Sequence, residues 1–191
     1  MKSIAISGSP RENVGKRDAK ELRYEGKVPA VLYGGKNQIH FSVSASDLKS
    51  LVYTPEVSFV ALDFAGVKAQ AIIQYVHFHP LSDLPLHVDF LELDEKKPVV
   101  MLIPVKLTGT SPGVKIGGKL VQKLRKLRVK ALPKDMPQYV EVSISQLEVG
   151  KSVGVGSLKF DNFVITNNPE DTIVSVTMSR ALKQAENDSK K

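Results

Sequence analysis

The sequence predicts a mainly β protein with short helices, folded as two domains. Glycine and proline recur every 8 to 15 residues, and the segments between them are short and rich in Val, Ile and Phe. Helical periodicity is confined to two short stretches before residue 53. A charged, proline-terminated segment at 94–98 separates one predicted strand from the next, and we place the domain boundary there.

The elements follow in order along the chain. An apolar opening at 4–6 suits a strand, and 16–25 suits a helix because it has no β-branched residue. Gly26 follows as a left-handed C-terminal cap. A second helix is expected at 45–52, with Ser44 as its N-cap. The remaining apolar runs predict strands at 57–64, 67–74, 86–93, 99–107, 139–144 and 172–178.

The composition excludes several classes of protein. The 191 residues include no cysteine, which excludes disulfides and thiolate zinc sites and favours a reducing compartment. No apolar run approaches the roughly 20 residues of a membrane helix, and the N-terminus lacks the apolar stretch of a signal peptide. We therefore expect a cytoplasmic protein with no membrane partner and no cofactor.

The net charge of +7 points to a polyanionic partner, and it is unevenly distributed. Residues 1–93 carry 10 Lys and Arg against 10 Asp and Glu, a net charge of zero. Residues 94–191 carry 17 against 10, a net charge of +7. The expected domains are 1–93 and 98–182, followed by a polar, disordered tail at 183–191.

The N-terminus has some features of a phosphate-binding loop. A strand leads into Gly8, and Gly15-Lys16 follows, but six residues separate the two glycines where a Walker A loop has four. Arg17 stands where that loop needs a Ser or Thr to bind magnesium. The long helices of a doubly wound nucleotide-binding fold are missing after Pro55. We therefore do not expect a nucleotide site.

A basic helix face is the first candidate site. If 16–25 is helical, Lys16, Lys20 and Arg23 share one face at spacings of four and three residues. Arg11 lies in the preceding loop. Such a surface can follow phosphates, and an arginine can also read a guanine edge. The alternative is a solvated helix whose basic residues pair with the interleaved acids.

A tyrosine followed by two glycines ends the next predicted strand, at 33–35. The glycines would let the backbone approach a ligand closely, and Tyr33 can stack on a base or a ribose. The alternative is a plain hairpin turn with a core tyrosine.

Polar side chains flank residue 80 on two predicted strands: Gln74, His77, His79, His87 and Asp89. If the strands pair, these side chains converge, although strand alternation places Gln74 on the opposite side from His77. Gln and His can hydrogen-bond base edges, and His stacks well, so the patch suits RNA. The same spacings supply the ligand types of a metal-dependent hydrolase. The third possibility is that the histidines are partly exposed and have neither role.

The segment 115–134 carries eight positive charges and no acid. Its leucines fit a helix, whereas its second half alternates apolar and basic residues. We favour a strand, with one densely basic face that suits phosphates. A solvated face is the alternative, although uncompensated charges at this density usually meet an anion. The residues that represent this secondary basic patch are Lys119, Lys123, Arg125 and Lys130.

The order of these features resembles one family. A Gly-Lys loop and a basic helix precede a Gly-Lys-x-Pro-Ala motif at 26–30 and a Tyr-Gly-Gly motif at 33–35. A Gln, His-Pro and His-x-Asp-Phe series follows at 74–90. Over residues 1–93 the set resembles the bacterial large-subunit ribosomal protein of the general-stress (Ctc) type. Residues 98–180 resemble the additional C-terminal domain of its longer members.

The resemblance implies a small N-terminal β-barrel with helices, a β-rich second domain and a non-enzymatic role in the ribosome. The exposed face of the barrel would bind the loop E region of 5S rRNA. Apart from the resemblance, the net charge of +7 in residues 94–191 suggests that the second domain meets 23S rRNA or a neighbouring ribosomal protein. The rivals are the metal-dependent hydrolase and an RNA-binding stress factor that meets the ribosome transiently. The implied RNA contacts are Arg11, Lys16, Lys20, Arg23, Tyr33, Gln74, His77, His79, His87 and Asp89.

Overall fold

The computed structural model describes most of the chain, namely residues 2–35, 37–64 and 67–179. The chain divides into two compact units: Met1–Val99 with Leu132–Gln138, and Val100–Ala131 with Tyr139–Lys191. The tail that we expect to be disordered lies outside the described residues. Strands predominate in the described part, which has three short α-helices, none of them long and apolar enough to cross a membrane.

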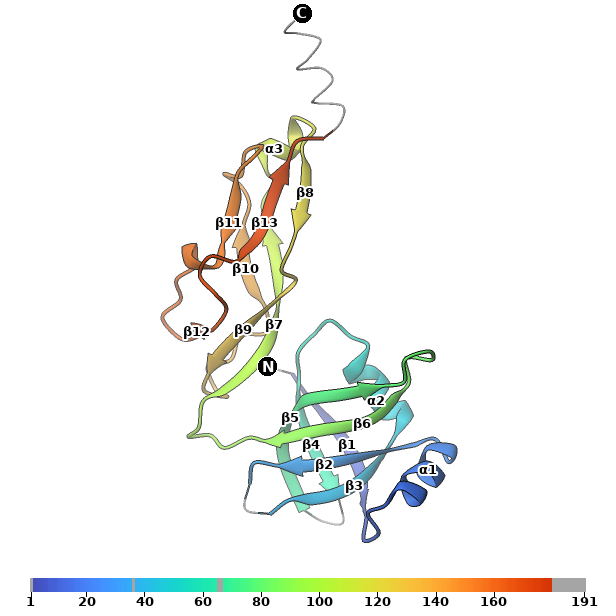
Figure 1. Cartoon of the computed structure of the whole chain (residues 1–191). Helices are drawn as coiled ribbons and strands as arrows, with labels where there is room; N and C mark the ends of the chain where they lie inside the picture. The colour runs from blue at the N-terminus through green and yellow to red at the C-terminus, as the bar shows by residue number, and fades with distance from the viewer. Residues whose placement is uncertain (1, 36, 65–66, 180–191) are drawn as a thin grey trace, which may run out of the picture. The chain divides into compact units, whose positions relative to one another are not determined.

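The first unit contains a closed barrel of six strands in the order β1-β3-β2-β6-β5-β4 (Figure 1). Neighbouring strands are antiparallel except for two parallel pairs, β1 with β4 and β2 with β6. The barrel implied by the resemblance is thereby confirmed. The strands are β1 (Ser3–Pro10), β2 (Lys27–Tyr33), β3 (Ile39–Ser44), β4 (Phe59–Phe64), β5 (Val67–Phe78) and β6 (Pro85–Glu92).

Three phenylalanines occupy the centre of the barrel. The ring of Phe41 lies 5.1 Å from that of Phe64 and 5.7 Å from that of Phe90, measured between centroids. Alternate residues of a strand face opposite sides, so this core also determines the outer surface. On β6, Val88 and Phe90 are fully buried, and the residues between and before them point outward.

Both predicted helices of the first unit are present, as α1 (Lys16–Tyr24) and α2 (Ala45–Val52). Gly26 adopts φ 76°, and its N–H donates to the carbonyl of Arg23 at 3.2 Å, so the expected left-handed cap is confirmed. The hydroxyl oxygen of Ser44 accepts from the N–H of Ser46 at 3.3 Å, as an N-cap should.

The second unit consists of two sheets, with strand orders β10-β7-β9-β12 and β11-β13-β8. Their core includes Ile103, Leu127, Val129 and Ile173, all fully buried. The elements are β7 (Val99–Thr108), α3 (Pro112–Lys115), β8 (Lys119–Gln122), β9 (Lys126–Ala131), β10 (Val140–Ser143), β11 (Ser152–Gly154), the 3₁₀ helix Val155–Ser157, β12 (Val164–Ile165) and β13 (Thr172–Thr177).

The basic segment 115–134 is extended, as favoured, but it is not one strand. The chain leaves β8 at Gln122, turns through 123–125, and enters β9 in the other sheet. The side-chain amide of Gln122 donates to the carbonyl of Leu124 at 3.2 Å within this turn. The single basic face expected for this segment is therefore wrong, because its charges are divided between two sheets and the turn that joins them.

Candidate nucleic-acid interface

The basic face of α1 is free of carboxylates. The helix forms one internal ion pair, Arg17 with Glu21 at 3.3 Å, on another side. Lys16, Lys20 and Arg23 have no carboxylate partner among the described residues. The alternative of a helix neutralised by its own acids is therefore not what this face shows. Three cations on successive turns of the helix are left to attract an anion.

Arg23 joins α1 to the barrel. Its Nε donates to the backbone carbonyl of Leu86, at the start of β6, at 3.0 Å. Lys20 extends over the exposed ring of Tyr24, with its Nζ 5.8 Å from the ring centroid. The bond from Arg23 places the basic helix face next to the strand that carries His87. The two candidate clusters found in the sequence are thus neighbours in space.

Arg11 does not fit the predicted role of a direct RNA contact. Its side chain is only 10% exposed and forms an ion pair with Asp18 in α1. Its Nη2 also donates to the carbonyl of Asn13 at 3.2 Å. These bonds close the loop between β1 and α1 on itself. Arg11 therefore holds this loop and the start of α1 in place, and the exposed cations of the helix remain available.

Strands β2, β6 and β5 lie side by side in the barrel (Figure 1). Residues Val28 to Leu32 of β2 are buried, so the exposed side chains of this region come from β6 and β5. Asp89 of β6 is level with Val31 of β2 and with Tyr75 of β5. His87 is opposite His77 of β5. Aromatic, imidazole and carboxylate groups from neighbouring strands therefore form two adjacent rows on one surface.

His87 is oriented by Asp89. Its Nδ1 lies 2.8 Å from Oδ1 of the carboxylate, and both side chains are about one-third exposed. A proton on Nδ1 is stabilised by this contact, which leaves Nε2 free to bond to a ligand. The carboxylate is thus engaged by the imidazole, which reduces its repulsion of a phosphate.

A β-bulge changes the pattern predicted for β5. The register with β6 shifts between Ile73 and Tyr75, so Gln74 is an extra residue. Gln74 is exposed, whereas Val76 packs on the core, so the prediction that Gln74 faces away from His77 is wrong. The next residue, Tyr75, is 60% exposed and is a further candidate for contact with RNA. Strand alternation alone could not distinguish this tyrosine from a structural residue.

Two other predicted residues lie at the margins of this face. Nδ1 of His79 accepts from the N–H groups of Leu81 and Ser82, both at 3.3 Å, so this ring shapes the β5–β6 turn. Tyr33 ends β2 level with Leu91 and is half-buried. It is two residues beyond the row of Asp89, about 7 Å along the strand.

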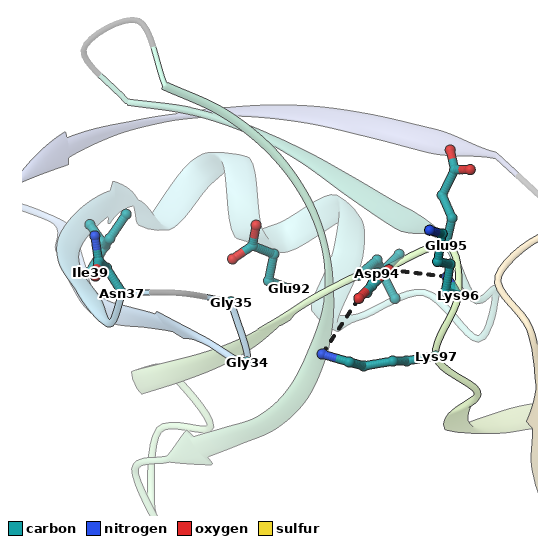
Figure 2. Close-up of a pocket in the computed structure, with 10 residues that line it drawn as sticks. Gly34, Gly35, Asn37, Ile39, Glu92, Asp94, Glu95, Lys96 and Lys97 are labelled. Carbon is teal, nitrogen blue, oxygen red and sulfur yellow. Dashed lines mark hydrogen bonds and ion pairs between the residues drawn. The ribbon is translucent and has the colours of Figure 1, made fainter.

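The Gly34-Gly35 turn belongs to a different site, an open pocket that Figure 2 shows. Its lining includes three acids, Glu92, Asp94 and Glu95, and two lysines, of which Lys97 pairs with Asp94 at 3.4 Å. The backbone N–H of Lys96 bonds to Asp94 at 3.1 Å and lowers the pKa of that carboxyl group. A Cβ on Gly35 would overlap the carboxylate of Glu92, so these glycines allow hairpin packing and not ligand approach.

A pair of glycine variants separates backbone strain from packing. Both Gly26 and Gly34 have positive φ, at 76° and 98°. A Cβ at Gly26 meets nothing within 4 Å, whereas one at Gly34 lies 2.6 Å from Cδ1 of Leu91. Urea unfolding should show a loss of about 1 kcal/mol for Gly26→Ala. Gly34→Ala should lose roughly 1–3 kcal/mol more, because Leu91 must move. Equal losses would contradict this difference in packing.

Comparison with known proteins identifies the family. Residues 6–90 match the Ribosomal L25p family, and residues 98–180 match a family described as Ribosomal protein TL5, C-terminal domain. The Large ribosomal subunit protein bL25 of Cytophaga hutchinsonii is 48% identical over 186 residues, which cover 97% of each chain. The chain belongs to the ribosomal L25p family.

Further relatives agree over nearly the whole chain. The proteins described as Large ribosomal subunit protein bL25 in Porphyromonas gingivalis and Amoebophilus asiaticus are 41% and 45% identical to it. They cover 97% and 96% of this chain and 97% and 93% of their own lengths. Membership of the L25p family, together with the TL5-type C-terminal region, confirms the resemblance to the long form.

The hydrolase alternative is wrong, because the L25p family consists of non-enzymatic ribosomal proteins. Within the described residues, no group of three or more His, Asp and Glu side chains is arranged to hold a metal ion. His79 uses Nδ1 in its own turn, and His87 uses Nδ1 toward Asp89.

Proposed function

We propose that this chain is a structural protein of the large ribosomal subunit, in the cytoplasm, and that its first unit binds the loop E region of 5S rRNA. The proposed interface is the basic face of α1 with the outer face of β6 and β5, and Tyr33 at the end of β2 lies at its margin. One observation carries the proposal: the bond from Arg23 to Leu86 places unpaired cations beside a row of aromatic and imidazole groups.

The two parts of this interface supply different interactions. Lys16, Lys20 and Arg23 contact phosphates, which gives affinity that depends on salt and not on sequence. The β5 and β6 side chains offer flat rings and hydrogen-bonding groups to unpaired or non-canonically paired bases, which are the usual targets of sequence-specific RNA recognition. An internal loop of RNA, and not a regular A-form helix, is therefore the preferred substrate.

The zero net charge of the first 93 residues is consistent with this interface. Acidic residues of this stretch lie elsewhere in the unit, as Asp47 in α2 and Asp63 in β4 do. The local field at α1 is positive because its three unpaired cations lie together, whatever the total charge.

The test is binding of the full chain to 5S rRNA, with scrambled RNA of the same length and tRNA as controls. Hydroxyl-radical footprinting should show protection confined to one internal loop. Uniform protection, or equal affinity for tRNA, would overturn the proposal. Sedimentation of ribosomes at rising salt addresses the rival role of a transient stress factor. A structural protein should remain with the large subunit at salt concentrations that release a transient factor.

Tyr75 offers a specific prediction for the β face. Tyr75→Ala should weaken binding to 5S rRNA by roughly 1–3 kcal/mol through lost stacking, with little change in salt dependence. Tyr139→Ala is the matched control, because that ring is also partly exposed, at 44%, but lies in the second unit. Titrations at several salt concentrations measure both quantities. Equal losses for the two variants would exclude a specific role for Tyr75.

A further inference from the structure

The second unit presents three cations in a row on one face of β9. The apolar residues of this strand are buried, at no more than 6% exposure. The basic residues that alternate with them all point to solvent. We call these residues the β9 row: Lys126, Arg128 and Lys130. The strand is thus amphipathic in the strict two-residue period of a sheet that covers a core on one side.

The β9 row is not neutralised by neighbouring acids. None of its three members has a carboxylate partner within 4 Å among the described residues. In the sheet order β10-β7-β9-β12, the acidic residue Glu141 is on β10, separated from β9 by a whole strand. Three like charges on one strand destabilise the free protein slightly, and an anionic partner would relieve this repulsion.

The row is held in a fixed geometry. The N–H of Arg128 donates to Oδ1 of Asn167 at 2.7 Å, and the N–H of Thr166 donates to the carbonyl of Arg128 at 2.8 Å. Successive members are two residues apart on a strand, which is about 7 Å. By contrast, Lys119 lies on β8 in the other sheet, and Lys123 lies in the turn between the sheets. The β9 row is therefore the part of the basic segment in which three cations lie on one face of a single strand.

Exposed aliphatic side chains flank the row, and the polar Thr166 and Asn167 beside it are bonded to the backbone of Arg128. Val164 of β12 is opposite Lys130 and is 64% exposed, and Leu102 of the adjacent strand β7 is 53% exposed. Neither side chain can donate or accept a hydrogen bond, so neither can read the edge of a base. The lysine and arginine termini can still bind phosphate oxygens from this surface.

We propose that the β9 row is a second RNA-binding surface, which contacts a phosphate backbone without reading its sequence. A regular line of unpaired cations complements a polyanion with repeating charges, such as RNA. An acidic protein surface is the competing class of partner. RNA is favoured because the proposed binding of the first unit to rRNA would keep this surface at high effective concentration beside other rRNA.

The first test compares two triple variants of the full chain. Lys126→Gln, Arg128→Gln and Lys130→Gln together remove the row. Lys115→Gln, Lys119→Gln and Lys123→Gln together remove the same charge from the same unit but leave the row intact. Circular dichroism and thermal unfolding verify that both variants fold. The probes are large ribosomal subunits depleted of this protein, and isolated 5S rRNA.

The row variant should bind the depleted subunits with a slope of log affinity against log salt that is smaller by about 2–3, since each phosphate contact contributes about 0.7–0.9. Its affinity for isolated 5S rRNA should not change. Equal loss in the control variant would overturn the assignment to β9. Because 5S rRNA binding is measured separately, failure of the row does not count against the proposed role of the first unit.

A crosslinking experiment identifies the class of partner. A photoreactive phenylalanine analogue replaces Val164, which is exposed beside Lys130 and carries no charge. After the full chain has bound to depleted subunits, illumination should join it to rRNA. Crosslinks to a ribosomal protein would overturn the proposal in favour of an acidic protein partner. An absence of crosslinks, with the same variant bound normally, would also overturn it.

Discussion

Replacing Lys16, Lys20 and Arg23 together by glutamine is expected to weaken binding to 5S rRNA by roughly 100-fold at moderate salt. The loss corresponds to about 3 kcal/mol, or about 1 kcal/mol for each charged contact. The slope of log affinity against log salt should also fall by about 2–3, because three phosphate contacts are removed. Titrations of labelled 5S rRNA at several salt concentrations provide both numbers.

The control for this variant removes the same charge from the same barrel. Lys2, Lys49 and Lys68 are exposed. Lys2 and Lys49 are not on the strands of the proposed interface, and Lys68 is at the other end of β5 from Tyr75 and His77. Their replacement by glutamine should reduce affinity only through the weaker long-range field, by less than about tenfold at 0.15 M salt, where the Debye length is about 8 Å. If both triple variants lose the same affinity and slope, net charge controls binding and the face of α1 has no special role.

Local sequence signals predicted the framework of the first unit because they act over a few residues. The helix at 16–25 is correct to within one residue, since Gly26 can adopt the left-handed conformation that ends it. Ser44 caps the second helix as expected. The barrel itself was implied by the family resemblance. Alternation alone does not distinguish a closed barrel from an open sheet, because both bury one side of each strand.

The parts that could not be predicted depend on contacts between distant segments. The bulge at Gln74 exists because β5 and β6 shift register, and a single strand carries no sign of its partner's register. The burial of Arg11 depends on its ion pair with Asp18 of α1, seven residues later. Arg11 itself is in a loop, where no periodicity indicates which way a side chain points. The division of 115–134 between two sheets depends on the pairing of β8 with β13 and of β9 with β12, and the paired residues are more than 30 positions apart.

The candidate site was predicted better by residue chemistry than by residue orientation. His77, His87 and Asp89 do share one outer face, as expected for paired strands. Their grouping with α1 was not visible in the sequence, since it relies on a bond between Arg23 and a backbone carbonyl 63 residues away. Backbone acceptors are present at nearly every residue, so composition does not reveal which one a side chain will use.

Phe41→Ala is expected to destabilise the first unit by about 3–5 kcal/mol, the cost of a large cavity where a buried aromatic ring is lost. Phe41 is fully buried and packs against both Phe64 and Phe90. A typical domain is stable by only about 5–15 kcal/mol, so this loss is a large fraction of the total. Phe41→Leu keeps more of the volume and should lose less than the alanine variant.

This variant also tests whether the two units unfold separately and whether the interface depends on the core. Calorimetry should show the transition of the first unit shifted to lower temperature, with that of the second unit unchanged, because the mutated core lies wholly within the barrel. Phe160→Ala, in the second unit and 37% exposed, should have a smaller effect and leave the first transition in place. A common shift of both transitions by either variant would show that the units unfold as one. Affinity for 5S rRNA should disappear as the first transition proceeds. His87 and Asp89 face outward only while Phe90, which is also on β6, stays packed against Phe41 in the core.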